Sequence, residues 1–152
     1  MIPWQQRALA AAIQAAPVLG IAVWWALLAT HSGDYAYMFV YFMPGLLMLA
    51  TALAVAFVAT IAAPRGFVRA HAAGSLRFHG IVVALMLLAL VPLFIATFAG
   101  GFMGGAHLIV LLSGVVLPLV ELGRSVLYGV VAARGEQPVR LLESSGRRGP
   151  GE

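Results

Sequence analysis

Long apolar stretches alternate with short polar ones along this chain. Four apolar stretches each exceed the roughly 20 residues that a helix needs to cross a hydrocarbon core about 30 Å thick. Charged residues are missing from the second and third of them. The pattern predicts an all-α integral membrane bundle of four transmembrane helices, at about residues 6–30, 35–63, 77–102 and 107–134.

Composition supports the same fold class. The chain of 152 residues is 62% hydrophobic and only 9% charged, and its mean hydropathy is +1.01. A soluble domain of this length needs a far larger polar surface, so we expect the lipid bilayer to surround the protein.

A signal peptide is the alternative for the first stretch. That stretch is longer than the apolar region of a usual signal peptide, contains Gln14 and Pro17, and lacks a small-residue cleavage site. We therefore expect that it is not cleaved and forms the first transmembrane helix.

Apart from Arg124, the arginine residues lie at helix ends or in connections on one side of the predicted bundle. The connections after the first and third helices, HSGDY and GGFMGGAH, contain none. The positive-inside rule then places both termini and residues 64–79 in the cytoplasm, with the helices in two antiparallel hairpins. We therefore expect a multi-pass protein of the inner (cytoplasmic) membrane. Eight arginines indicate this topology: Arg7, Arg65, Arg69, Arg77, Arg134, Arg140, Arg147 and Arg148.

Two structures fit the inner connection at residues 64–79. One is a short helix along the membrane surface, with Phe67, Val68 and Leu76 in the interface, and the other is a hydrated loop. Residues 136–152 contain too few apolar side chains to pack, which predicts a disordered cytosolic tail after a single domain over residues 1–135. The connection also supplies candidate docking residues: Arg65, Arg69, His71 and Arg77.

Each predicted helix contains a proline. Proline has no backbone N–H, so it frees a carbonyl one turn earlier and bends the helix. Proline is common in membrane helices without any special role. Four prolines also fit a kinked bundle with a cavity at mid-depth, and both interpretations stay open for Pro17, Pro44, Pro92 and Pro118.

Two charged residues interrupt the last apolar stretch. Glu121 and Arg124 are three residues apart, so on a helix their side chains share a face and can pair. An unpaired charge at mid-bilayer costs about 2.5–3.5 kcal/mol, which predicts that the pair faces the bundle, a partner protein or an aqueous cavity rather than lipid. Gln14, His79 and Ser125 fall at a similar depth and complete a predicted polar cluster in the inner half. The cluster is either a staple that fixes helix register or a site for protons, ions or a polar solute.

The sequence contains little that indicates a cofactor site or a catalytic site. A b-type haem needs two histidines that face each other within the membrane. His31 and His107 fall at the outer helix ends, and His71 and His79 fall near the inner face. There is no cysteine, no HExxH motif and no phosphate-binding loop, and Ser113 and Ser125 have no suitably placed histidine in the sequence. We therefore expect no cofactor, no metal, no catalytic residue and no nucleic-acid partner.

Two short motifs resemble a known family. HAAGSLRFH, with His71, Phe78 and His79, resembles a motif in which a histidine precedes a Phe-Gln pair at the start of a transmembrane helix. YGVVAARGEQPVRL resembles the ending of the same family, with Gly135 and Glu136 as its Gly-Glu pair. The family is the bacterial Tic20-like group of small four-helix membrane proteins, and residues 71–141 carry the resemblance. The resemblance implies a helical bundle in a cytoplasmic membrane with a translocation-related or accessory role.

Three functions fit these observations. The leading hypothesis is a non-enzymatic membrane protein that is a subunit or accessory component of a larger membrane assembly. The alternative is a small oligomeric transporter or channel for protons or a small polar solute, with Glu121 and Arg124 in its path. A haem or quinone redox subunit is the third. The expected partners are the lipid bilayer and other membrane protein subunits or further copies of the chain.

Overall fold

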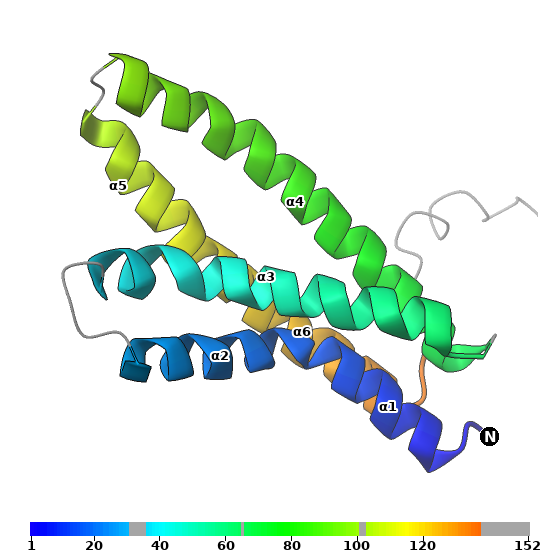
Figure 1. Cartoon of the computed structure of the whole chain (residues 1–152). Coiled ribbons are helices and arrows are strands. Elements are labelled where there is room, and N and C mark those ends of the chain that lie inside the picture. The colour runs from blue at the N-terminus through cyan, green and yellow to red at the C-terminus, as the bar shows by residue number, and fades with distance from the viewer. Residues whose placement is uncertain (31–35, 65, 101–102, 138–152) are drawn as a thin grey trace, which may run out of the picture.

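The computed structural model describes residues 1–30, 36–64, 66–100 and 103–137, and these are almost entirely helical. Arg65, His31 and the predicted tail from residue 138 onward lie outside the described residues. No strand occurs in the described ranges. Figure 1 shows the helices, which are α1 (Trp4–Gln14), α2 (Ala16–Thr30), α3 (Ala36–Ala62), α4 (Phe67–Gly100), α5 (Met103–Leu111), the π-helical segment η1 (Leu112–Val116) and α6 (Leu117–Ala133).

Several of these helices are long and apolar enough to cross a bilayer. Three segments meet that condition alone, namely Met43–Ala62, Phe67–Ala99 and His107–Ala133. α1 and α2 supply a fourth span if they cross together, with a bend of 49° between them. The all-α fold class with apolar membrane helices is therefore confirmed, for three spans or four.

The first predicted helix is broken in two at Ala15. α1 ends at Gln14 and α2 begins at Ala16, where a single continuous helix had been expected over residues 6–30. Pro17 lies in the first turn of α2 and is buried. Its ring excludes the normal hydrogen bond one turn back, and the Val18 N–H instead bonds the Ala15 carbonyl at 2.9 Å. The proline explains why the chain bends at this point.

The predicted inner connection is mostly helix. α4 begins at Phe67 and runs for 34 residues without a break, so residues 67–79 are neither a hydrated loop nor a separate helix along the membrane surface. The actual connection between α3 and α4 is short and turns at Gly66, whose φ of 134° favours glycine. The expectation that Phe67 and Val68 lie in the membrane interface was wrong. Both side chains are buried against α1 and α6.

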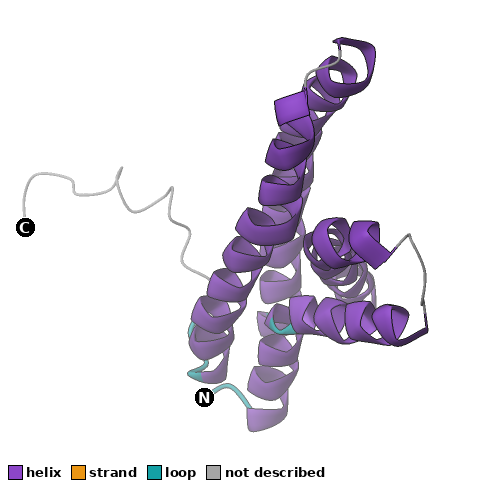
Figure 2. Cartoon of the chain, turned by 90° about the vertical axis from the view of Figure 1, so that its left-hand side faces the viewer, coloured by secondary structure: helices purple, strands orange, loops and turns teal. Residues whose placement is uncertain are grey.

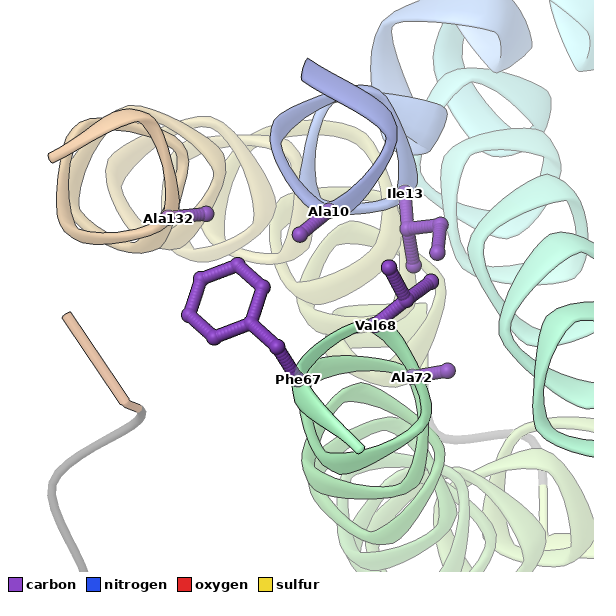
Figure 3. Packing of buried hydrophobic residues seen from close by; sticks show 6 residues of the cluster. All are labelled: Ala10, Ile13, Phe67, Val68, Ala72 and Ala132. Atoms are coloured by element: carbon purple, nitrogen blue, oxygen red, sulfur yellow. The ribbon is translucent and has the colours of Figure 1, made fainter. Parts of the chain in front are cut away.

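A small apolar core holds the inner end of the bundle together. Figure 3 shows its side chains meeting where α1, α4 and α6 come together. An alanine on each of the three helices lets the backbones approach, while Phe67 fills the space between them. The core consists of Ala10, Ile13, Phe67, Val68, Ala72 and Ala132.

The other prolines have different local effects. Pro44 and Pro92 lie inside α3 and α4, which continue past them. Pro118 lies in the first turn of α6, directly after the π-helical segment η1. The wider π turn leaves room for the proline ring. A Cβ atom on Gly45 would lie 2.1 Å from the Ser113 carbonyl oxygen, so α3 and η1 are in close contact here. At this point the prolines accompany tight packing rather than a cavity.

The helices form two hairpins that meet at one end. α2 packs along α3, and α4 contacts α5. Figure 1 shows the two hairpins diverging away from a common base, and Figure 2 shows the same divergence from a second direction. The N-terminus, the turn between α3 and α4, and the end of α6 all lie at this base. The base therefore brings together α1, α4 and α6, while α3 also contacts η1 farther along the bundle.

We expect Gly20→Val to lower the free energy of unfolding by about 1–3 kcal/mol, because a larger side chain would separate α2 from α3. A Cβ atom on Gly20 would lie 2.5 Å from the backbone of Met48. Gly129→Ala is the control, since a Cβ atom there meets nothing within 4 Å. Denaturant unfolding in mixed micelles measures both. Equal loss of stability in the two variants would show that the α2–α3 contact is not limiting.

Candidate functional site

A group of buried polar side chains lies at the base of the bundle, between α1, α4 and α6. We call this group the polar centre, and its members come from positions that repeat along helix faces. On α4, residues 71, 75 and 79 are spaced by four, and on α6 residues 121, 124 and 125 share one face. The members are Gln14, His71, Ser75, His79, Glu121, Arg124 and Ser125, all at most 8% exposed.

The strongest contact in the polar centre joins α4 to α6. His79 Nε2 lies 2.8 Å from Glu121 Oε2, and both side chains are fully buried. On its other side, His79 Nδ1 lies 2.7 Å from the Ser75 carbonyl oxygen. A carbonyl oxygen only accepts, so Nδ1 carries a proton. A further proton must lie between Nε2 and the carboxylate, because two lone pairs would repel at 2.8 Å.

The pair of His79 and Glu121 therefore carries no net charge. With that shared proton on either partner, the two groups are an imidazolium with a carboxylate or a neutral ring with a carboxylic acid. Both arrangements sum to zero. Burial in an apolar bundle favours such a pair over an isolated carboxylate.

Arg124 has different partners from those expected. Within the part of the chain that the structure describes, the ion pair of Glu121 is with His79 and not with Arg124. The guanidinium lies 4.4 Å from the centre of the Phe78 ring and 4.9 Å from that of Tyr128. Its Nη1 donates to Ser75 Oγ at 3.4 Å. Two aromatic faces and a hydroxyl thus replace the predicted carboxylate.

A second set of contacts ties α1 and the end of α6 to α4. Gln14 Nε2 donates to the His71 carbonyl oxygen at 3.2 Å. The His71 ring is fully buried, and its Nε2 donates to the Glu136 carbonyl oxygen at 3.0 Å. His71 was expected in an exposed docking connection, and the structure places it inside the bundle because α4 begins at Phe67.

The end of α6 is shaped to present that carbonyl. The Gly135 N–H bonds the Ala132 carbonyl, and the Glu136 N–H bonds the Val131 carbonyl at 3.1 Å. This is a Schellman turn, and it needs the φ of 79° that Gly135 adopts. A Cβ atom on Gly135 would also lie 3.0 Å from Arg7 Cδ. The Gly-Glu pair is therefore a helix end that contacts both α1 and α4.

Some polar atoms of the centre lack protein partners. Three of them belong to residues that line a small pocket of about 120 Å³ between α1, α4 and α6: Gln14 Oε1, His71 Nδ1 and Arg124 Nε. Gly74, Ser75, Phe78 and Tyr128 complete its lining. Glu121 Oε1 and Ser125 Oγ are also unpartnered, but their residues do not line it. The pocket is thus a polar space next to a buried cation.

The remaining predicted site residues lie apart from the centre. Arg69 and Arg77 are exposed on α4, where they are free to meet lipid headgroups. Among the described residues, no group of three or more His, Asp or Glu side chains is placed to hold a metal ion. Sequence reasoning missed Ser75, Phe78 and Tyr128 as contacts of Arg124. The four-residue spacing of His71, Ser75 and His79 indicates Ser75 as a further polar residue on the same helix face, but only for a helix that begins at Phe67 instead of residue 77.

We expect Glu121→Leu to lower the free energy of unfolding by about 3–5 kcal/mol, because it leaves the buried His79 ring without its partner. The double variant with His79→Leu should recover at least about 1 kcal/mol of that loss, since it removes both polar groups. Unfolding of the four proteins of this cycle in mixed micelles measures the coupling. A larger coupling between Glu121 and Arg124 in a parallel cycle would contradict the assigned pairing.

Gly135→Ala should lower the free energy of unfolding by about 1 kcal/mol, because alanine resists the positive φ of the Schellman turn. Glu136→Ala should change it by less than about 0.5 kcal/mol, since only the backbone carbonyl of Glu136 bonds His71. The same unfolding measurement compares the two adjacent variants. A larger effect at Glu136 would mean that its carboxylate, and not the turn, supports this end of α6.

Comparison of the chain with protein-family models, with curated proteins and with solved structures gives no match. The interpretation of the polar centre therefore depends on its own geometry. That geometry shows polar side chains from α1, α4 and α6 that bond one another at the base of the bundle.

Proposed function

We propose that the chain is a non-enzymatic multi-pass protein of the cytoplasmic membrane and a subunit or accessory component of a larger membrane assembly. In this proposal α1 and α2 cross the membrane as one bent span, giving four spans with both termini in the cytoplasm. The observation that carries it is the polar centre, whose contacts join helices of the same chain. His79 with Glu121 connects α4 to α6, and Gln14 with His71 connects α1 to α4.

Polar side chains beyond the centre support a structural role. Ser113 Oγ donates to the Ile109 carbonyl oxygen at 2.7 Å, and Thr97 Oγ1 donates to the Leu93 carbonyl oxygen at 2.8 Å. Each bond stays within one continuous helical stretch and joins no second helix. In the described residues, the hydrogen bonds between side chains of different helices thus stay at the base. A continuous polar route through a single chain lacks support.

The outer part of α4 offers a surface for lipid or for a neighbouring subunit. Ile81, Leu85, Leu88 and Ile95 follow one another at helical spacing and are 59–73% exposed. Phe98 is 72% exposed near the end of the helix. Such an apolar helix face is stable in lipid and also suits packing against a transmembrane helix of another protein.

A second candidate is a small oligomeric transporter or channel for protons or a polar solute. The pocket beside Arg124 favours it, because buried ionisable groups next to a polar space are typical of such pathways. Other copies of the chain would have to supply the outer half of the route.

The Tic20-like relationship is likewise a proposal, and it is supported by the contact of two of its motif residues, His71 and Glu136.

Native mass spectrometry of the protein, extracted gently from its own membrane, tests the leading proposal. We expect a mass that contains at least one other protein, whose identity would indicate the function of the assembly. A monomer that is stable in the mildest detergent would contradict it. A homo-oligomer would instead favour the transporter, and Glu121→Gln should then abolish proton or solute flux in proteoliposomes while oligomers still form.

A further inference from the structure

The pocket beside Arg124 has an unusual charge balance for the interior of a membrane bundle. The Glu121 carboxylate is close enough to attract the guanidinium of Arg124, but its direct ion pair is with His79. Arg124 is 8% exposed, and its direct contacts are two aromatic faces and one hydroxyl. A buried cation that forms no salt bridge with a described residue needs some other polar surroundings.

The unpartnered atoms around the pocket define what those surroundings are. Arg124 Nε carries a proton and is a donor. Gln14 Oε1 is an acceptor, because the amide nitrogen of that side chain already donates to the His71 carbonyl. His71 Nδ1 is also an acceptor, because Nε2 holds the ring proton that bonds Glu136. The pocket thus offers one donor and two acceptors on residues that are at most 8% exposed.

One small molecule matches this set. Water donates two hydrogen bonds and accepts others, and buried water typically makes about three bonds to unsatisfied polar groups. A cavity of about 10–15 Å³ already holds one water molecule, so the pocket of about 120 Å³ has room for several. An inorganic anion fits less well, since it would face the lone pairs of Gln14 Oε1 and His71 Nδ1.

We propose that this pocket is a water-binding site that solvates Arg124 from the inner part of the membrane. Water donates to Gln14 and His71 and accepts from Arg124, which completes the hydrogen bonding of three buried side chains. The cation is then stabilised by hydration and by the Phe78 and Tyr128 rings, in addition to the attraction of the nearby Glu121 carboxylate. Aqueous access consequently reaches Ser75, which bonds both Arg124 and His79.

Cysteine accessibility tests this proposal directly, because the chain contains no cysteine of its own. A thiol reacts with iodoacetamide as the thiolate, which forms where water reaches it. Ser75→Cys places a thiol in the pocket. Ser113→Cys is the matched control, because both serines are 1% exposed and only Ser75 lines the pocket. Gly74→Cys is a second pocket variant, which does not replace the Arg124 contact.

Each folded variant is treated with iodoacetamide in proteoliposomes, and alkylation is followed by mass spectrometry. We expect both pocket variants to react at least about tenfold faster than Ser113→Cys, because the thiolate fraction depends on contact with water. Rates for Gly74→Cys and Ser75→Cys as slow as the control would overturn the proposal. A fast reaction of Ser75→Cys alone would also overturn it, since Arg124 could then be activating the thiol without a hydrated pocket. Size-exclusion elution before and after reaction establishes that each variant is folded, and equal rates in denaturant show that all three thiols are competent.

Discussion

Polar side chains buried in an apolar bundle need hydrogen-bond partners in the protein or in enclosed water, and the arrangement of α1, α4 and α6 depends on this constraint. The strongest direct contact joins His79 and Glu121, with a 2.8 Å hydrogen bond between two fully buried groups. This hydrogen bond forms only at one rotation of α4 about its axis relative to α6 and at one position of the two helices along the bundle. The apolar core around Phe67 would tolerate small shifts, whereas a hydrogen bond would not.

The same constraint reaches the ends of the helices. His71 can donate to Glu136 only because α6 stops in a turn that directs this carbonyl toward α4. Gln14 bonds the backbone of α4 one position before the bend at Ala15, so α1 is held at the base while α2 departs along α3. Polar contacts thus fix the base, and apolar packing with close glycine approaches organises the diverging hairpins.

The apolar stretches predicted the all-α membrane class, because lipid leaves few alternatives to long apolar helices. They did not predict the break at Ala15 or the start of α4 at Phe67. The break follows from the position of Pro17 in the first turn of α2. At the start of α4, mixed polar and apolar residues form a helix whose polar side packs against other helices. Charge and spacing predicted Glu121 and Arg124, depth in the membrane added Gln14, His79 and Ser125, and the structure buries all five. Their pairing was not predictable from spacing, since the i to i+3 argument considers one helix and the partner of Glu121 lies on another.

The π-helical segment Leu112–Val116 separates α5 from the polar face of α6. A π-helical turn holds one more residue than an α-helical turn. Loss of one residue there would let an unbroken α-helix form with little rotation of α5 relative to Glu121 and Arg124, because the wider turn already accommodates the extra residue. Loss of one residue within the regular α6 would instead rotate one part of the helix against the other by about 100°. Length changes in this chain would therefore be tolerated differently on the two sides of Pro118, with the polar centre on the side that cannot shift.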